Sequence, residues 1–243
     1  MGLRDSRTVV LTVGVFALLG AQSAVAEVVE RIMRVSGTTV HYKVVLPDGY
    51  DAAKDYPAVL VMGGGPQTMN TVDGTLDRNF RAEAERRGYL VVAPAAPDGA
   101  LFFQGGERIF PEFLDEVLTN YRIVGGKFHV AGPSNGGIAA LHVAAAYPQY
   151  FLSATAFPGY LWQPSEAKLI ALSNLCVFMY VGEHDEYRWH DEMRREVEFL
   201  NTRGTVARYT VERGQPHRLE TLAGASASRL FEGFEEASRG CRR

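Results

Sequence analysis

The sequence has little cysteine, and its two cysteines, Cys176 and Cys241, do not share a metal-ligand spacing with the histidines. We therefore expect no zinc site and no other metal or cofactor. Clusters of one charge are also missing, because 25 basic and 28 acidic side chains are dispersed over 243 residues with a net charge of −3. Proteins that mainly bind nucleic acids usually carry a basic patch, so we expect no nucleic-acid partner.

Repeats and low-complexity tracts are absent too. The N-terminus, however, contains a long uncharged run from Val9 to about Ala21. Two arginines precede this run, and the small residues Ala24-Val25-Ala26 follow it. This order is typical of a secretory signal peptide, and the run is too short to span a membrane comfortably. We predict a signal peptide over residues 1–26, a single domain over residues 27–243, export to the periplasm or the medium, and no stable membrane span after cleavage.

Export would allow the two cysteines to oxidise. A bridge between Cys176 and Cys241 would close a loop of about 65 residues and contribute about 4 kcal/mol in the chain-entropy model. Cys176 begins a predicted buried strand, whereas Cys241 lies in a polar tail. The sequence leaves open whether they form a disulfide.

Short apolar segments alternate with amphipathic ones along the whole chain after residue 27. This alternation is typical of an α/β fold, in which a mostly parallel central sheet carries helices on both faces. We expect residues 28–46 to form a hairpin at an antiparallel edge of that sheet. Further strands are predicted at 57–62, 89–94, 128–131, 152–158, 176–181 and 205–212, and helices at 76–87, 109–122, 138–146, 165–173, 190–203 and 219–238.

A candidate nucleophile lies between the strand at 128–131 and the helix at 138–146. The motif there is Gly132-x-Ser134-x-Gly136, and a strand, a sharp turn and a helix with serine at the apex form a nucleophile elbow. With this composition the bare motif would occur by chance in roughly one chain in ten. The interpretation therefore requires a base, an acid and an oxyanion hole elsewhere in the chain.

His217 is the candidate base, since it alone among the histidines lies in a Gly/Pro loop after the last predicted strand. The carboxyl ends of parallel strands meet at one edge of a sheet, where His217 would reach Ser134. The remaining histidines fall within predicted strands (His41, His129), within or at the start of helices (His142, His190) or beside a candidate acid (His184).

Asp185 is the candidate acid, because it follows a strand end and lies between the serine and the histidine in sequence. The order serine, aspartate, histidine is that of the α/β-hydrolases. Glu183 and Asp191 are the alternatives.

An oxyanion hole needs backbone N–H groups near the nucleophile. We expect one donor to be the amide of Asn135, directly after Ser134. The other should come from the glycine loop after the first parallel strand, where Gly64 is the first choice and Gly65 the second; Pro66 has no N–H.

With these residues in place, the chain resembles the α/β-hydrolase superfamily over essentially all of residues 27–243. The segment Ala131-Gly-Pro-Ser-Asn-Gly-Gly137 looks like the elbow of polyhydroxybutyrate-depolymerase-like and feruloyl-esterase-like enzymes, and the preceding helix around Phe113-Leu-Asp-Glu is similar to theirs. Small carboxylesterase/phospholipase-type hydrolases are similar too. These families usually have His-Gly at the oxyanion strand end, where this chain has Met62.

The short connection between two predicted strands bears on the kind of substrate that the site can admit. Fewer than twenty residues separate the strand ending near Phe157 from the one beginning at Cys176, so we expect no large lid or cap. An open site suits small esters or ester side groups of a polymer. Four aromatic residues are candidates for lining it: Phe103, Tyr160, Trp162 and Trp189.

The sequence thus predicts a serine esterase that acts through an acyl-enzyme intermediate. The alternatives are a serine peptidase of prolyl-oligopeptidase type, which normally carries a propeller domain for which this chain has no room, and a non-catalytic binding protein with a hydrolase fold. The sequence does not indicate an oligomeric state.

Overall fold

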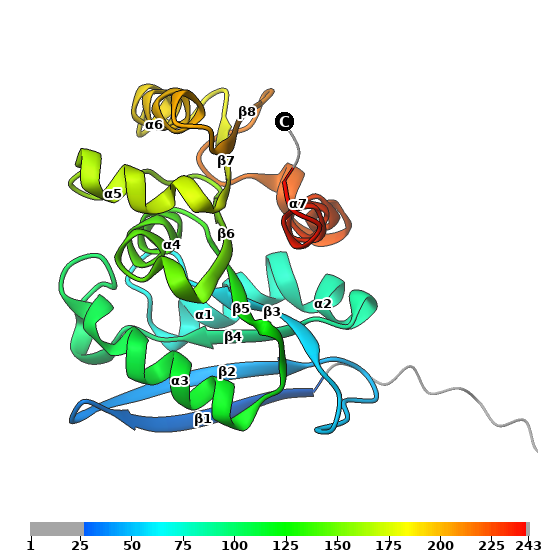
Figure 1. Cartoon of the computed structure of the whole chain (residues 1–243). Coiled ribbons are helices and arrows are strands. Elements are labelled where there is room, and N and C mark those ends of the chain that lie inside the picture. Colours follow the sequence, from blue (N-terminus) through cyan, green and yellow to red (C-terminus); the bar gives the residue numbers. More distant parts are fainter. Residues whose placement is uncertain (1–26, 242–243) are drawn as a thin grey trace, which may run out of the picture.

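One β-sheet of eight strands forms the centre of the fold, and the computed structural model describes it with its helices over residues 27–241 (Figure 1). The strands are β1 (Glu27–Val35), β2 (Thr38–Leu46), β3 (Tyr56–Val61), β4 (Leu90–Pro94), β5 (Ile123–Gly132), β6 (Phe151–Ala156), β7 (Cys176–Gly182) and β8 (Val206–Glu212). Their order in the sheet is β1-β2-β4-β3-β5-β6-β7-β8. β2 pairs antiparallel with β1 and β4, and the remaining pairs are parallel. The predicted fold class and edge hairpin are confirmed.

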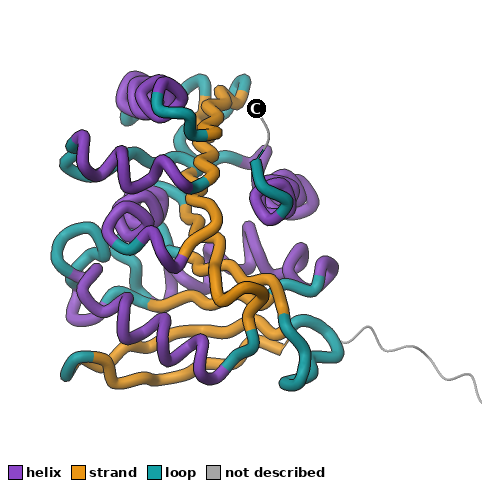
Figure 2. The backbone as a smooth tube through the Cα atoms, in the orientation of Figure 1, coloured by secondary structure: helices purple, strands orange, loops and turns teal. Residues whose placement is uncertain are grey.

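Helices cover both faces of the sheet, as Figure 2 shows. They are α1 (Met69–Thr75), α2 (Arg81–Arg87), α3 (Phe110–Asn120), α4 (Asn135–Ala146), α5 (Glu166–Ala171), α6 (His190–Thr202) and α7 (Ser228–Ser238), with a π-helical turn η1 (Leu76–Phe80) between α1 and α2. Residues of α3, α4 and α6 share one core cluster, whereas α1, α2 and α7 belong to a second cluster. Each face of the sheet therefore has its own core.

The inner strands form because their residues are apolar on both faces. Every residue of β4 is buried, as are the last four of β3. A parallel strand covered on both sides needs this continuous apolar pattern rather than an alternating one. The arrangement places the carboxyl ends of β3, β5, β7 and β8 along one edge of the sheet.

Two predicted helices differ from the structure. The helix predicted at 76–87 belongs to a longer run that begins at Met69 and contains the π-helical turn. The helix predicted at 219–238 is wrong in its first half, where the 3₁₀ turns Glu220–Leu222 and Gly224–Ala227 precede α7. Ala223 is extended and Gly224 has a φ of 54°, which interrupts the helix.

The predicted signal peptide, residues 1–26, lies outside the described residues. Within residues 27–241 no helix combines the length and apolar character that crossing a membrane requires.

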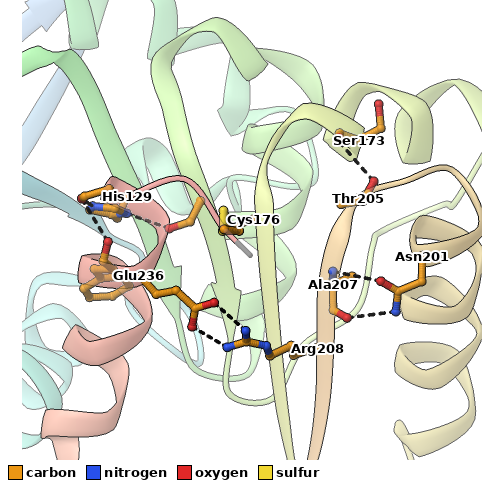
Figure 3. The surroundings of a disulfide bond; sticks show 12 residues. His129, Ser173, Cys176, Asn201, Thr205, Ala207, Arg208 and Glu236 are labelled. Carbon is orange, nitrogen blue, oxygen red and sulfur yellow. Dashed lines mark hydrogen bonds and ion pairs between the residues drawn. A yellow bond between two sulfur atoms is a disulfide. The ribbon is translucent and has the colours of Figure 1, made fainter. Parts of the chain in front are cut away.

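A disulfide joins Cys176, the first residue of β7, to Cys241 after α7, and this settles the question that the sequence leaves open. The two Cα atoms are 6.1 Å apart and 65 residues apart in sequence. An ion pair between Arg208 of β8 and Glu236 of α7 lies beside it (Figure 3). The C-terminal helix is thus held to the sheet by a covalent bond as well as by packing.

Removal of this bridge by Cys241→Ala should lower the free energy of unfolding by about 2–4 kcal/mol, because the unfolded chain regains the freedom of a long loop. Urea denaturation of the wild type and the variant measures the difference. Dithiothreitol should destabilise the wild type by a similar amount and leave the variant unaffected. Equal midpoints for the oxidised wild type and the variant would contradict a stabilising role.

Candidate active site

Ser134 occupies the sharp turn between β5 and α4. Its backbone has φ 55° and ψ −124°, outside the regions that non-glycine residues favour, as a nucleophile elbow requires. The N–H of Ser134 donates to the carbonyl of Pro158 at 2.8 Å. The turn therefore presents the side chain at the sheet edge and holds it there through the segment after β6.

The glycines two residues before and after Ser134 are required by close backbone approach. A Cβ on Gly132 would lie 2.5 Å from the carbonyl carbon of Gly136, and a Cβ on Gly136 would collide with the carbonyl oxygen of Met62. No real Cβ approaches backbone atoms so closely, so only glycine lets β5, α4 and the end of β3 meet.

The structure brings the three predicted catalytic residues together in one hydrogen-bonded chain. Nε2 of His217 is 2.8 Å from Oγ of Ser134, and its Nδ1 is 3.0 Å from Oδ2 of Asp185. The Asp185 side chain is fully buried, whereas that of His217 is slightly exposed. This arrangement can transfer a proton from the serine to the imidazole and stabilise the imidazolium that results.

Backbone hydrogen bonds hold the acid and the base in place. The N–H of Tyr187 donates to Oδ1 of Asp185 at 2.8 Å, and the N–H of His217 donates to Oε2 of Glu186 at 3.1 Å. Hydrogen bonds from its own backbone N–H and from that of His217 keep the pKa of Glu186 below its ordinary value. Glu186 therefore stays ionised beside the loop that carries the base.

The alternative acids have other partners. Glu183 accepts a hydrogen bond from the N–H of Gly214 at 2.8 Å, and Asp191 pairs with Arg194 on the surface of α6. Neither contacts the histidine in the described structure. Asp185 is thus the acid that the geometry supports.

His129 shows why a buried histidine is not by itself a catalytic one. Its ring stacks on Phe234 and lies between the hydroxyls of Ser153, at 2.7 Å, and Ser238, at 3.1 Å (Figure 3). Burial lowers its pKa to about 3, so the ring is neutral at ordinary pH. It joins α7 to the sheet on the side of the disulfide.

The predicted oxyanion donors lie at the mouth of the same turn. The N–H of Asn135 is the first of α4 and has no hydrogen-bond partner among the described residues. Gly64 and Gly65 line the cavity beside Ser134. Within residues 27–241, the N–H of Gly64 has only a long contact of 3.5 Å to Oγ1 of Thr75. These amides can donate to an oxyanion between the glycine loop and α4.

Two amide residues hold the glycine loop: Asn135, which is predicted only as a backbone donor, and Gln67, which the sequence does not single out. Nδ2 of Asn135 donates to the carbonyl of Gly65 at 2.9 Å. The fully buried Gln67 donates its N–H to the Gly64 carbonyl at 3.2 Å, and its Oε1 accepts from the N–H of Phe102 at 2.9 Å. Met62 is buried in the core. The Asn135 side chain and the Gln67 backbone therefore hold the loop, and the side chain of Met62 packs in the core.

A cavity of about 420 Å³ opens beside the nucleophile. Its lining comes from the glycine loop, α1, η1, the elbow and the His217 loop. The residues are Gly64, Gly65, Asn70, Thr71, Gly74, Thr75, Arg78, Asn79, Pro133, Ser134, Phe157, Pro158, His217, Arg218 and Leu219. Within residues 27–241, no group of three or more His, Cys, Asp and Glu side chains is arranged to hold a metal ion.

The four aromatic residues predicted to bind substrate lie outside this lining, as far as residues 27–241 are described. Phe103 is buried and packs on Trp162, with ring centres 5.2 Å apart. Trp189 instead contacts the base, with its ring centre 4.8 Å from that of His217, and Tyr160 packs on Trp189 with ring centres 5.1 Å apart. Tyr187, which the sequence reasoning missed, lies 4.5 Å from the His217 ring and is 61% exposed.

A buried carboxyl supports the segment that carries Tyr160. Glu196 of α6 accepts hydrogen bonds from the N–H of Leu161 at 3.0 and 3.1 Å. Burial raises the pKa of Glu196 to about 7. The carboxyl therefore binds a proton more tightly in the folded protein than in the unfolded chain.

This raised pKa makes stability depend on pH. The contribution of Glu196 to the free energy of unfolding is fully present below its ordinary pKa of 4.5 and decreases as pH rises through about 7. Between pH 4 and pH 8 the wild type should lose about 3 kcal/mol relative to Glu196→Gln, which does not titrate there. Urea denaturation at both pH values measures this change.

The matched control is Glu198→Gln, at an exposed carboxylate of the same helix. A difference between the wild type and Glu196→Gln that stays constant from pH 4 to pH 8 would show that the pKa of Glu196 is not raised.

Comparison with known proteins gives one family match. Residues 107–232, just over half of the chain, match the family model named Esterase and described as "Putative esterase". Among curated proteins, the chain is 30% identical over 128 residues to dipeptidyl-peptidase 5 of Porphyromonas gingivalis, covering 48% of this chain and 19% of that protein. It spans a fifth or less of the length of the curated relatives that it matches.

Solved structures agree with the fold at low sequence identity. An acetyl xylan esterase from Aspergillus awamori superposes with a TM-score of 0.67 at 14% identity, over 86% of this chain and 99% of the other. A feruloyl esterase module from Clostridium thermocellum superposes with a TM-score of 0.65 at 18% identity, over 88% of this chain and 86% of the other. Both likenesses concern the fold alone.

Proposed function

This chain belongs to the Esterase family, and we propose that it is an exported serine hydrolase that cleaves carboxylic esters. The observation that carries the proposal is the hydrogen-bonded chain from Ser134 through His217 to Asp185, with the serine on an elbow beside an open cavity. The family match supports ester hydrolysis, and the residue arrangement supplies the chemistry that it needs.

In the first half of the reaction, Oγ of Ser134 attacks the ester carbonyl while Nε2 of His217 accepts its proton. A serine hydroxyl is a weak nucleophile until a base takes this proton. Asp185 accepts a hydrogen bond from Nδ1 of His217, which keeps Nε2 free to act as the base and stabilises the imidazolium. The buried position of Asp185 strengthens that interaction because little water screens it.

The tetrahedral intermediate carries a negative oxygen, which the N–H groups of Asn135 and of Gly64 or Gly65 can bind. The N–H of Ser134 cannot contribute, since it donates to Pro158. His217 then protonates the leaving alcohol as the C–O bond breaks. Water, activated by the same imidazole, hydrolyses the acyl-enzyme and releases the acid.

A peptidase is the second candidate, because the curated relatives are dipeptidyl-peptidases. The same triad can cleave amides, so the distinction depends on which bonds the cavity accepts. A protein that uses the fold only for binding is the third candidate, and the assembled serine, histidine and aspartate argue against it.

Export is supported by the N-terminal pattern and by the disulfide. Disulfides persist mainly in oxidising compartments such as the periplasm and the extracellular space. The bond between Cys176 and Cys241 fits such a compartment.

Ser134→Ala should abolish labelling by a fluorophosphonate probe and lower kcat/KM for a 4-nitrophenyl ester by at least about 10⁴-fold, since the nucleophile is lost. Gel fluorescence and steady-state assays measure the two effects, and Ser153→Ala, which removes a buried hydroxyl that is hydrogen-bonded to His129, is the labelling control. Unlabelled wild type, or equal labelling of Ser134→Ala, would contradict catalysis. Turnover of dipeptide anilides without turnover of aryl esters would favour the peptidase.

Expressed with its own N-terminus in a bacterial host, the protein should be recovered outside the cytoplasm with Glu27 as its first residue. The reason is the small residues at Ala24 and Ala26, which signal peptidases require before the cleaved bond. Intact mass and N-terminal sequencing measure the cleavage, and Ala26→Trp should block it. A cytoplasmic protein that keeps residues 1–26 would contradict export.

A further inference from the structure

The charged side chains that line the cavity beside Ser134 are all of one sign. Its lining contains the two arginines Arg78 and Arg218 and, within the described residues, no aspartate or glutamate. The nearest carboxylates on the same helical run are outside the lining and are paired, Asp73 with Lys43 and Asp77 with Arg81. The potential inside the cavity therefore favours a negative group over a positive one.

Arg78 is the more buried of the two arginines, with a side chain 20% exposed. It lies on the π-helical turn η1, a rare distortion that often occurs at functional sites. Its Nη2 donates to Oε1 of Glu220 at 2.6 Å and to the carbonyl of Leu219 at 3.4 Å. Its Nε and Nη1 have no hydrogen-bond partner within the described residues, so the N–H groups on these two nitrogens remain available.

Glu220 holds this guanidinium without burying it. The Glu220 side chain is 64% exposed and does not line the cavity, so water screens its charge. It orients Arg78 from outside the cavity lining. Asn79, the next residue, donates to the carbonyl of Leu222 at 2.6 Å and fixes the same turn against the loop after His217.

We propose that Arg78 determines substrate specificity by binding an anionic group, a carboxylate or similar oxyanion, carried by the ester in addition to its scissile bond. Arginine suits this role because it stays charged and its N–H groups form charge-assisted hydrogen bonds to carboxylate oxygens. The inference rests on the proposed esterase function and extends it, since it names the chemical class of substrate that the cavity accepts. The anionic group can belong to the acid or to the alcohol portion of the ester.

A purely structural role for Arg78 is the competing explanation. The pair of Arg78 with Glu220 joins η1 to the segment just after His217, and its loss could displace the base. The two roles differ in what Glu220→Gln does. If the pair is only a latch, removing either partner has the same effect; if Arg78 binds substrate, removing Glu220 leaves the guanidinium available.

The experiment compares kcat/KM for two pairs of nearly isosteric esters. In the first, mono-4-nitrophenyl glutarate, with a carboxylate on the acid portion, is paired with 4-nitrophenyl glutaramate. In the second, 3-carboxyphenyl butyrate, with a carboxylate on the alcohol portion, is paired with 3-carbamoylphenyl butyrate. Wild type, Arg78→Gln, Arg78→Lys and Glu220→Gln are measured, and the rate of fluorophosphonate labelling reports whether each triad is intact.

The wild type should prefer the anionic member of at least one pair by roughly 10-fold or more, and that pair identifies which portion of the ester enters the cavity. Arg78→Gln should lower the anionic-to-neutral ratio about 10- to 100-fold, as expected for loss of a charge-assisted hydrogen bond. Arg78→Lys should retain part of the preference, and Glu220→Gln should retain or increase it.

Three results would overturn the inference. A wild type that hydrolyses the neutral esters without preferring either anionic one contradicts the inference and leaves the esterase function standing. If Arg78→Gln and Glu220→Gln lose activity on all esters alike and keep the anionic-to-neutral ratio of kcat/KM unchanged, the ion pair has a purely structural role. A wild type that hydrolyses none of the four esters contradicts the proposed function and the inference with it.

Discussion

The contact between backbones at the elbow is the constraint on which the rest of the site depends. The chain passes so close to itself there that Gly132 and Gly136 have no room for a Cβ against each other or against the carbonyl of Met62. This contact joins the ends of β3 and β5 and the first turn of α4. It forces Ser134 into its unusual backbone conformation and places the glycine loop within reach of the same turn.

Amide residues next to these glycines hold the glycine loop in place. The esterases that this sequence resembles usually have His-Gly at the end of the oxyanion strand. Here Met62 packs in the core, the Asn135 side chain holds Gly65, and Nε2 of Gln67 makes a long contact of 3.5 Å with the carbonyl of Asn135. The asparagine therefore has two roles: its backbone N–H can bind an oxyanion, and its side chain holds Gly65. The departure at Met62 does not leave the loop unsupported.

Two different groups of residues surround the triad. The cavity beside Ser134 is lined in part by α1 and η1 and contains Arg78 and Arg218, and among the described residues no carboxylate lines it. Tyr187 and Trp189, which do not belong to that lining, pack against the ring of His217, and Tyr160 packs on Trp189. The base therefore borders both a cavity that contains two arginines and an aromatic surface.

The sequence by itself determined the fold class and the order of its elements, because continuous apolar strands and amphipathic helices differ in period. It also located Ser134, Asp185 and His217, since each follows a predicted strand and the carboxyl ends of parallel strands meet at one edge. Only the tertiary structure decided what depends on contacts between distant segments. Gln67 accepts a hydrogen bond from Phe102, Arg78 pairs with Glu220, and Cys176 forms a disulfide with Cys241. No local sequence pattern predicts such pairs. The four aromatic residues predicted to bind substrate are a further example. Their aromatic side chains suggested a binding surface, but only the packing of the folded chain shows that Trp189 contacts His217.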